Sequence, residues 1–336
     1  MNRRLKAALI GCGMIADNHL TALQNIGVSV VGVYDLNHAA ALSFAESRSL
    51  FVYNTLEALL QDDTDLVAVC TPSGTHADLA VSIMEHGKCA VVEKPIALTN
   101  VDCQRILQTE MKTGRFCAPI SQLRFSDTYR TVKNAVDSES FSRILLGSLS
   151  MKYYRSPEYF AGSWRGTKAM DGGGALMNQG IHGIDMLCGL LGCPKQISGH
   201  IATLHHDIEV EDMAVASLVF PSGALGVIDA GTAITYSKPR RLEICGTHAS
   251  VTIEEDVLLS SEGISLTGGT PTTIRSWETP SAFSADLHTT QYRNICAAIR
   301  NEEPLYYTAL EAANTIKVIL AIYESSETGK TIILDI

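Results

Sequence analysis

Gly11-Cys12-Gly13-Met14-Ile15-Ala16 forms a glycine-rich turn between two patterned segments. Residues 7–10 before it are an apolar run typical of a buried strand, and residues 15–26 place apolar side chains at helical spacing. A turn of this kind brings backbone N–H groups and a helix N-terminus up to a pyrophosphate. Gly11 permits the tight turn, Gly13 permits close approach of the backbone, and the small Ala16 lets helix and strand pack closely. The stretch predicts a dinucleotide-binding turn, against the alternative of an ordinary strand–turn–helix with packing glycines.

A second apolar run, residues 28–34, ends in Asp35, about 20 residues past the glycines. An acid at this place can hold the 2′-hydroxyl of a ribose, and its charge repels a 2′-phosphate. Leu36-Asn37-His38 follows and supplies no strong cation. NAD is therefore the expected cofactor, with NADP left open. The alternative role for Asp35 is to cap the next helix.

The composition indicates a folded enzyme of more than one domain. A chain of 336 residues is long for one hydrophobic core, and 46% apolar with 18% charged residues excludes disorder. No apolar run approaches the roughly 20 residues of a membrane span. The net charge of −10 argues against nucleic acid or an anionic membrane as a partner.

Nine cysteines are scattered without a CxxC pair, which favours reduced thiols over a disulfide framework. Cys188 and Cys193 do not have zinc-knuckle spacing, so we expect them to lie in the core. Arg3-Arg4 resembles a twin-arginine export signal, but the apolar stretch behind it is short and is already the first strand. A cytoplasmic location is expected.

The first third of the chain alternates apolar strands with helical patterns. We expect further strands at residues 66–70, 89–92 and 117–121, and helices at 75–86, with a cap at Ser73 or Thr75, and at 100–112. Repeated strand–helix units with continuous apolar strands predict an α/β fold with a doubly wound parallel sheet. Residues 1–122 are assigned to this first domain.

The pattern changes near Gln122, where strands begin to follow one another. Strands are expected at residues 144–154, 196–204, 213–220, 224–234, 241–245 and 250–254, with Pro221-Ser222-Gly223 as a hairpin turn. Helices are expected at residues 175–191, 283–300 and 308–324. The second domain, residues 123–304, is thus predicted to be α+β, a large open antiparallel sheet with helices on one face.

Five motifs occur together with the glycine turn. They are Cys70-Thr71-Pro72-Ser73-Gly74-Thr75-His76, Glu93-Lys94-Pro95, Gln122-Leu123-Arg124-Phe125, Trp164-Arg165, and the run from Gly172 to Asp185, GGGALMNQGIHGID. In this order the chain resembles the Gfo/Idh/MocA oxidoreductase family, over essentially its whole length. The resemblance implies a Rossmann domain followed by an open antiparallel sheet, a C-terminal segment (about 305–336) that packs back on the first domain, and a homodimer or homotetramer formed through the exposed sheet face. It also implies NAD(P)-dependent chemistry on sugars, cyclic polyols or sugar derivatives.

Lys94 is the expected proton donor or acceptor. It lies at the C-terminal end of a parallel strand, the edge where open α/β sheets bind ligands, and Pro95 ends that strand. Neighbouring side chains of an extended strand point to opposite faces, so Glu93 need not neutralise the amine. Partial desolvation beside a cationic nicotinamide favours a lysine that accepts a proton. The resemblance likewise implies that this lysine acts at the reacting carbon, often before a cis proline; the alternative is a strand-end lysine in solvent.

Asn178 and His182 are four residues apart on one predicted helix and share a face. Many family dehydrogenases have an aspartate at this spacing that orients the histidine as a proton relay. An amide cannot stabilise an imidazolium as a carboxylate does, so Asn178 shifts the proton role towards Lys94. His182, with Asn178, is expected to act in catalysis, either by transferring a proton or by contacting the substrate only, against the alternative of a structural histidine. Asp185 either orients His182 or is structural.

The resemblance also implies contacts to the nicotinamide end of the cofactor. The predicted cofactor-binding residues are Gly11, Cys12, Gly13, Met14, Ile15, Asp35, Thr71, Pro72, His76, Glu93, Lys94, Arg124, Trp164 and Arg165. As plain residues, several of these equally suit turns, helix starts and core edges. No metal is expected, and His205-His206-Asp207 is interpreted as a solvated turn rather than a metal site. Two alternatives to a dehydrogenase stay open: an NAD-dependent glycosidase that oxidises its substrate transiently, and a non-catalytic dinucleotide sensor.

Overall fold

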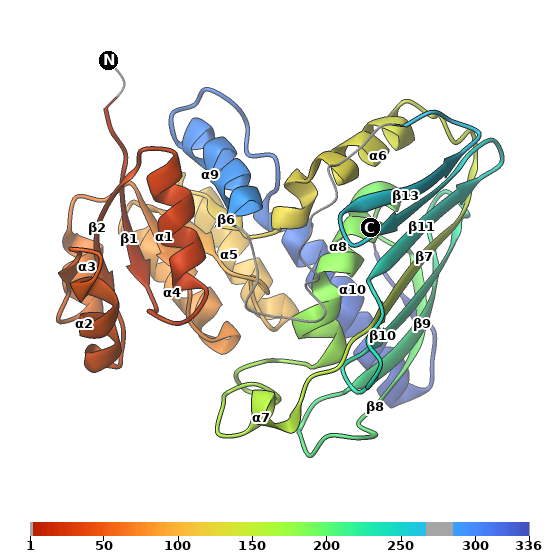
Figure 1. The fold of residues 1–336 in the computed structure, drawn as a ribbon, viewed down its shortest axis with the longest axis horizontal. Helices are drawn as coiled ribbons and strands as arrows, with labels where there is room; N and C mark the ends of the chain where they lie inside the picture. The colour runs from red at the N-terminus through yellow and green to blue at the C-terminus, as the bar shows by residue number, and fades with distance from the viewer. Residues whose placement is uncertain (1–2, 267–284, 336) are drawn as a thin grey trace. The chain divides into compact units, whose positions relative to one another are not determined.

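The computed structural model describes residues 3–266 and 285–335, which form two compact units (Figure 1). Unit 1 comprises Met1–Gln122 and Ser284–Ala313, and unit 2 comprises Leu123–Phe283 and Asn314–Ile336. The chain thus leaves unit 1 at Gln122 and returns to it once, for the segment that holds helix α9.

Unit 1 is built on a six-stranded parallel sheet in the order β3-β2-β1-β4-β5-β6. The strands are β1(Lys6–Ile10), β2(Ser29–Tyr34), β3(Phe51–Val52), β4(Leu66–Val69), β5(Cys89–Val92) and β6(Cys117–Pro119). The strand order reverses between β1 and β4, and this switch point is where a doubly wound sheet binds its ligand. The predicted Rossmann sheet is confirmed.

Helices cover the sheet of unit 1. They are α1(Ala16–Asn25), α2(His38–Glu46), α3(Leu56–Gln61), α4(His76–Glu85), α5(Asn100–Thr113) and α9(Asp286–Ile299). Asn37, Thr55 and Thr99 cap α2, α3 and α5 by accepting a backbone N–H two or three residues into the helix. Thr75, one of the two expected caps, is the N-cap residue of α4, but its hydroxyl makes no capping hydrogen bond. Ser73 and Thr75 belong to a 3₁₀ turn, η1(Ser73–Thr75), and the Thr75 hydroxyl donates to the Pro72 carbonyl at 2.8 Å.

The core of unit 1 joins the two ends of its sequence. Side chains of β1 and α1 pack with Tyr292 and Ile295 of α9, all of them fully or nearly fully buried. α9 therefore stands beside α1 although more than 250 residues separate them. We expected the helix to begin at Phe283, which lies outside the described residues; the described helix begins at Asp286.

Unit 2 contains an eight-stranded sheet in the order β13-β12-β11-β7-β10-β9-β8-β14. Its strands are β7(Ile144–Lys152), β8(Gln196–Ala202), β9(Met213–Val219), β10(Leu225–Gly231), β11(Arg241–Gly246), β12(Ser250–Glu254), β13(Val257–Glu262) and β14(Ile332–Ile333). The hairpin between β9 and β10 is confirmed. The sheet is not purely antiparallel as predicted, because β10 pairs with β7 in parallel. The long connection between these two strands carries helices and two further strands, which is the crossover that parallel pairing needs.

Helices lie along one face of this sheet (Figure 1). They are α6(Asp127–Asp137), α7(Pro157–Phe160), α8(Ile181–Leu191) and α10(Ala309–Thr328), with a π-helical segment η3(Ala175–Gly180) before α8. α8 packs on β7, where a Cβ at Gly147 would lie 2.8 Å from the Leu187 side chain. α10 packs on β8, where Ser325 accepts the Gly199 N–H at 3.0 Å. The predicted helix over 175–191 is thus present, but its first turn is π-helical.

The C-terminal segment differs from the expectation drawn from the family. β14 pairs with β8, and Leu334 donates its N–H to the Lys195 carbonyl at 2.9 Å, so residues 314–336 belong to unit 2 rather than unit 1. Backbone pairing at the edge of an open sheet explains this placement.

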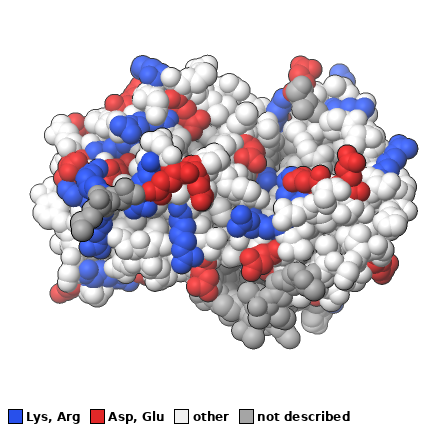
Figure 2. All heavy atoms as spheres, turned by 90° about the horizontal axis from the view of Figure 1, so that it is seen from above, with Lys and Arg blue, Asp and Glu red and all other residues white. Residues whose placement is uncertain are grey.

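All nine cysteines are free thiols. Within residues 3–266 and 285–335, no helix combines the length and the apolar character needed to cross a bilayer. Charged side chains of both signs are interspersed over the face shown in Figure 2.

Candidate functional site

The glycine turn follows β1 at the carboxyl edge of the parallel sheet. Gly11 has φ +93°, and its N–H donates to the Tyr34 carbonyl at 2.8 Å. A Cβ at Gly11 would lie 2.7 Å from the Cys70 carbonyl oxygen, so only glycine fits there. Gly13 is different, because a Cβ there would meet no protein atom within 4 Å. The protein itself does not require glycine at 13, whereas a pyrophosphate approaching the backbone does, and the turn therefore fits a dinucleotide.

Asp35 is bonded to this turn. One carboxylate oxygen accepts the N–H of Cys12 and the other accepts the N–H of Asn37, each at 2.8 Å. Asn37, not Asp35, caps helix α2. Burial and the nearby Asp35 carboxylate raise the pKa of the Cys12 thiol to about 12, which makes it an inert packing group. Met14 has 71% of its surface exposed at the mouth of the turn.

Two loops follow the next strands of the sheet, β4, which pairs with β1, and β5, which pairs with β4. The loop after β4 touches the glycine turn, where a Cβ at Gly11 would meet Cys70 and Thr71. His76 joins the two loops: its Nδ1 lies 2.7 Å from the Pro95 carbonyl oxygen and its Nε2 lies 2.8 Å from the Thr71 carbonyl oxygen. Burial lowers the pKa of His76, so the imidazole is neutral and donates to one carbonyl at a time. Thr71 bonds the Thr75 hydroxyl at 2.6 Å. The structure thus gives His76 the task of fixing the loops that carry Thr71, Pro72 and Lys94.

Glu93 and Lys94 follow β5 directly, and the Lys94–Pro95 peptide bond is cis. The Glu93 side chain is buried, and its Oε2 accepts the backbone N–H of Lys94 at 3.1 Å. Its Oε1 lies 3.0 Å from His19 Nε2 and 3.5 Å from His288 Nε2. Lys94 itself is half-buried. The carboxylate therefore faces α1 and α9, and Lys94 follows β5 at the sheet edge that bears the glycine turn.

The buried pair of histidines around Glu93 was missed by the sequence reasoning. Burial raises the pKa of Glu93, but the neighbouring His19 and His288 lower it by more, so the net pKa of Glu93 is well below the usual value. Burial lowers the pKa of His19. A neutral His19 donates Nε2–H to Glu93 and accepts the Tyr292 hydroxyl at Nδ1, over 2.6 Å. The three donor atoms lie within 4.8 Å of one another, close enough to share a metal ion, and both ring nitrogens of His288 are buried without a hydrogen-bond partner among the described residues. The expectation that no metal binds stays a prediction.

In unit 2, Arg124 and Asp185 form a buried ion pair. Arg124 Nε and Nη2 donate to the two oxygens of Asp185 at 2.7 and 2.9 Å, and Nη1 donates to the Tyr129 hydroxyl at 2.8 Å. Thr315 of α10 also donates to Asp185, at 3.0 Å. Asp185 is thus held in a buried ion pair, and the two roles expected for it, orienting His182 or serving as a structural acid, stay predictions. The bidentate pair gives Arg124 a structural role, and its predicted cofactor contact stays a prediction.

The π-helical segment η3 is held by two carboxylates. Glu211 accepts the N–H of Gly174 at 2.9 Å and that of Leu176 at 2.8 Å. Asp171 accepts the Asn178 side-chain amide at 2.8 Å, and it too was missed by the sequence reasoning. No sequence spacing pointed to Asp171, because it lies in the irregular segment before η3 and not on the helix that carries Asn178. Asn178 is thus oriented by a buried acid, and His182 follows it on α8, half-buried.

The aromatic and basic side chains near Trp164 form a second group in unit 2. The Arg165 guanidinium carbon lies 4.7 Å from the Tyr159 ring centroid and 5.1 Å from the Trp164 ring centroid. The loop His205-His206-Asp207, which was expected to be a solvated turn, is only partly exposed. His206 is buried, with Nδ1 3.2 Å from Asp212 and Nε2 2.8 Å from the Arg155 carbonyl oxygen, whereas His205 and Asp207 are exposed.

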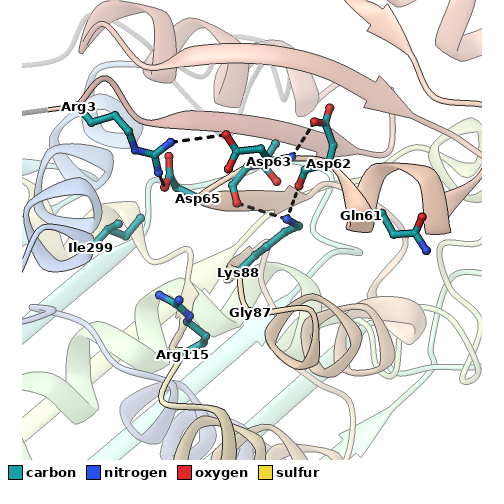
Figure 3. Close-up of a pocket in the computed structure, with 10 residues that line it drawn as sticks. Arg3, Gln61, Asp62, Asp63, Asp65, Gly87, Lys88, Arg115 and Ile299 are labelled. Carbon is teal, nitrogen blue, oxygen red and sulfur yellow. Dashed lines mark hydrogen bonds and ion pairs between the residues drawn. The ribbon is translucent and has the colours of Figure 1, made fainter.

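One pocket, of about 440 Å³, lies at the opposite edge of the unit 1 sheet (Figure 3). Arg3, Asp65, Lys88 and Arg115 line it, each just before a strand begins. Figure 3 shows the Lys88 amine pointing to the Asp62 backbone and Arg3 pointing to Asp65. Arg3 pairs with Asp65, and the Lys88 amine donates to backbone carbonyls, all at the amino ends of the strands and away from the glycine turn, so this pocket is not the candidate site.

Comparisons with known proteins match both halves of the chain. Residues 5–120 match the model of an oxidoreductase family with an NAD-binding Rossmann fold, and residues 129–252 match the GFO/IDH/MocA C-terminal domain. The chain belongs to the Gfo/Idh/MocA family. The inositol 2-dehydrogenase of Salmonella paratyphi B is 34% identical over 164 residues, 46% of this chain and 48% of the relative, so the match spans about half of that relative's length.

Two further Gfo/Idh/MocA proteins match over nearly the full chain. The scyllo-inositol 2-dehydrogenase (NAD(+)) of Bacillus subtilis is 24% identical, covering 100% of this chain and 98% of its own. The WlbA dehydrogenase of Bordetella pertussis, solved in complex with NADH and UDP-GlcNAcA, has a TM-score of 0.89 at 26% identity, with 100% and 99% of the two chains covered. The family and its fold are thereby confirmed.

Proposed function

We propose that this Gfo/Idh/MocA protein is an NAD-dependent dehydrogenase or reductase acting on a sugar, an inositol-like polyol or a sugar derivative. The observation that carries the proposal is the placement of Lys94 after β5, on the same sheet edge as the glycine turn and Asp35. Bound NAD supplies a hydride acceptor at the nicotinamide ring, which takes hydride from an alcohol carbon. Such an oxidation also releases a hydroxyl proton, which needs a positioned acceptor.

The chain's own residues divide this work. Lys94 takes the hydroxyl proton on oxidation and returns it on reduction. The Glu93 carboxylate holds the Lys94 backbone through its Oε2, while His19 is hydrogen-bonded to the other oxygen and His288 lies 3.5 Å from it. His182 contacts the substrate and Asn178, oriented by Asp171, supports it. Thr71, Pro72 and Trp164 remain proposed contacts around the nicotinamide end, and Arg165 remains a proposed contact where that end meets the substrate.

The preference for NAD over NADP follows from Asp35. Both of its oxygens are fixed by backbone N–H groups, so the charge cannot swing away from a 2′-phosphate. Arg48, a cation on the neighbouring helix end, donates to Asp17 at 2.9 and 2.5 Å and is committed there. The relatives include one named for NAD and one named for NADP, so membership of the family does not settle the cofactor. Our choice of NAD therefore rests on the carboxylate of Asp35.

The exposed face of the unit 2 sheet supports self-association. Leu146, Leu225 and Val227 are 39%, 55% and 45% exposed and lie on adjacent strands β7 and β10. Apolar side chains gathered on one open sheet face favour contact with a second copy. We propose a homo-oligomer, a dimer or tetramer, formed through this face; Leu225→Glu should lower the mass measured by light scattering, and an unchanged mass would count against it.

Nine free thiols suit a reducing compartment, and we propose a cytoplasmic location.

The function is tested by NAD reduction with a panel of inositols, hexoses and uronic acids, followed at 340 nm. We expect NADH to accumulate with at least one member, and a higher kcat/KM with NAD than with NADP. Tight NADH binding without turnover of any alcohol or ketone would support the sensor instead. Release of an aglycone from glycosides without net NADH would support the glycosidase.

A further inference from the structure

Two guanidinium groups of unit 2 lie against one aromatic ring. The Arg155 guanidinium carbon is 5.7 Å and that of Arg165 is 4.7 Å from the Tyr159 ring centroid. Arg155 also lies 5.5 Å from the Tyr153 ring centroid. Aromatic faces attract cations, but a ring shared by two cations does not remove their mutual repulsion.

Neither guanidinium is paired with an acid. Within residues 3–266 and 285–335, neither Arg155 nor Arg165 forms an ion pair with a carboxylate. Arg155 is only 5% exposed, and its side chain donates to the Tyr154 carbonyl and to the Gln179 side-chain oxygen, both neutral groups. Its Nε is buried without a hydrogen-bond partner. Burial accordingly lowers the pKa of Arg155.

Two other buried arginines of unit 2 have the acidic partners that Arg155 lacks. Arg124 has Asp185, and Arg240 has Glu255 and Asp256 within 3.6 Å. A buried cation without such a partner is costly to the fold unless something compensates it. Arg155 and Arg165 converge from either side of α7, and Arg155 is bonded to Gln179, the neighbour of Asn178. The unpaired charge therefore lies beside the segment to which we assign substrate binding.

We propose that Arg155 and Arg165 form a subsite for an anionic group of the substrate, a carboxylate or a phosphate. The guanidinium fork matches the geometry of both groups, and such an anion would compensate the charge that no described carboxylate compensates. The inference rests on the proposed dehydrogenase function, and it narrows the substrate from any sugar or polyol to one that carries a negative charge.

The test compares probes that differ by one charged group, titrated calorimetrically into the full chain saturated with NADH. D-Glucuronate is paired with neutral D-glucuronamide, and D-glucose 6-phosphate with D-glucose. We expect at least one charged probe to bind about tenfold or more tightly than its neutral match, the size expected of charge-assisted hydrogen bonds. The pair that shows the difference tells whether the subsite takes a carboxylate or a phosphate.

Variants then assign the preference to these side chains. Arg165→Gln, at a half-buried position, should reduce the ratio of charged to neutral affinity to about twofold or less, and Arg155→Lys, which keeps the charge but loses the fork, should lower it partly. Arg143→Gln is the matched control: it removes an exposed arginine at the other end of β7 and should leave the ratio unchanged.

Equal affinities within both pairs, no binding of either charged probe, or an equal effect of Arg143→Gln would overturn the subsite. NADH formation from neutral polyols alone would also overturn it while keeping the dehydrogenase. Failure of the wild-type chain to bind NADH at all would instead overturn the proposed function.

Discussion

The two glycines of the turn predict opposite effects when each is replaced by alanine. At Gly11 an alanine must adopt a positive φ of 93°, which costs about 1–2 kcal/mol, and its Cβ would lie 2.7 Å from the Cys70 carbonyl, adding about 1–3 kcal/mol of overpacking. Gly11→Ala should therefore lower the free energy of unfolding by about 3 kcal/mol. At Gly13 the φ is not in the left-handed region and a Cβ meets nothing within 4 Å. Gly13→Ala should leave stability unchanged or raise it by up to about 1 kcal/mol.

NADH affinity separates the two variants further. If the space beside Gly13 is where the pyrophosphate approaches, the added methyl group should weaken NADH binding about tenfold or more, close to 1.4 kcal/mol. Urea unfolding measures the stability of each variant, and quenching of intrinsic fluorescence measures NADH binding. The reasoning is refuted if Gly13→Ala binds NADH within about twofold of the wild type, or if it unfolds as easily as Gly11→Ala.

Three further predictions concern groups around the same edge of unit 1. Burial holds the pKa values of His19 and His76 below their usual 6.5, so below that pH the unfolded chain binds more protons than the folded one. The contribution of these histidines to the free energy of unfolding should be complete above pH 6.5 and fall below it by up to about 1.4 kcal/mol per pH unit for each histidine. Equal urea midpoints at pH 7.5 and 5.5 would contradict this. Asp35→Ala should move the ratio of kcat/KM for NAD over NADP towards NADP by about tenfold, and an unchanged ratio would argue that the carboxylate does not face the ribose. Glu93→Gln should lower the free energy of unfolding by about 2–3 kcal/mol, because the amide cannot accept from both His19 and the Lys94 N–H as the carboxylate does. The control Glu85→Gln, at an exposed position, should change it by less than about 0.5 kcal/mol, and equal losses would rule out a special role for the buried acid.

Local sequence pattern was enough to predict the sheet of unit 1. The strands β1, β2, β4 and β5 are short apolar runs with a glycine or polar turn after each, and burial on both faces makes such runs visible without any partner. Strand pairing in unit 2 was harder, since the parallel pairing of β7 with β10 depends on chain segments some 70 residues apart.

The environment of Lys94 could be predicted only in part. The Glu93-Lys94-Pro95 order placed the lysine at a strand end, but His19 and His288 reach Glu93 from 74 and 195 positions away, and no spacing signals that meeting. A histidine buried on the apolar face of each helix was the available clue, because a polar ring among core residues needs a partner. For Arg124 and Asp185 the reverse holds: both were singled out for function, and their mutual pairing explains why both charges are tolerated in the core.

The role of Lys94 is tested most directly by replacing its amine while keeping the cofactor site intact. Lys94→Met retains the length of the side chain and removes the group that exchanges the proton, so the rate of NADH formation at saturating NAD and substrate should fall by about 10²–10⁴-fold, the contribution of general acid–base catalysis. The Kd for NADH should stay within about threefold of the wild type. Turnover by Lys94→Met within about tenfold of the wild type would contradict the central claim.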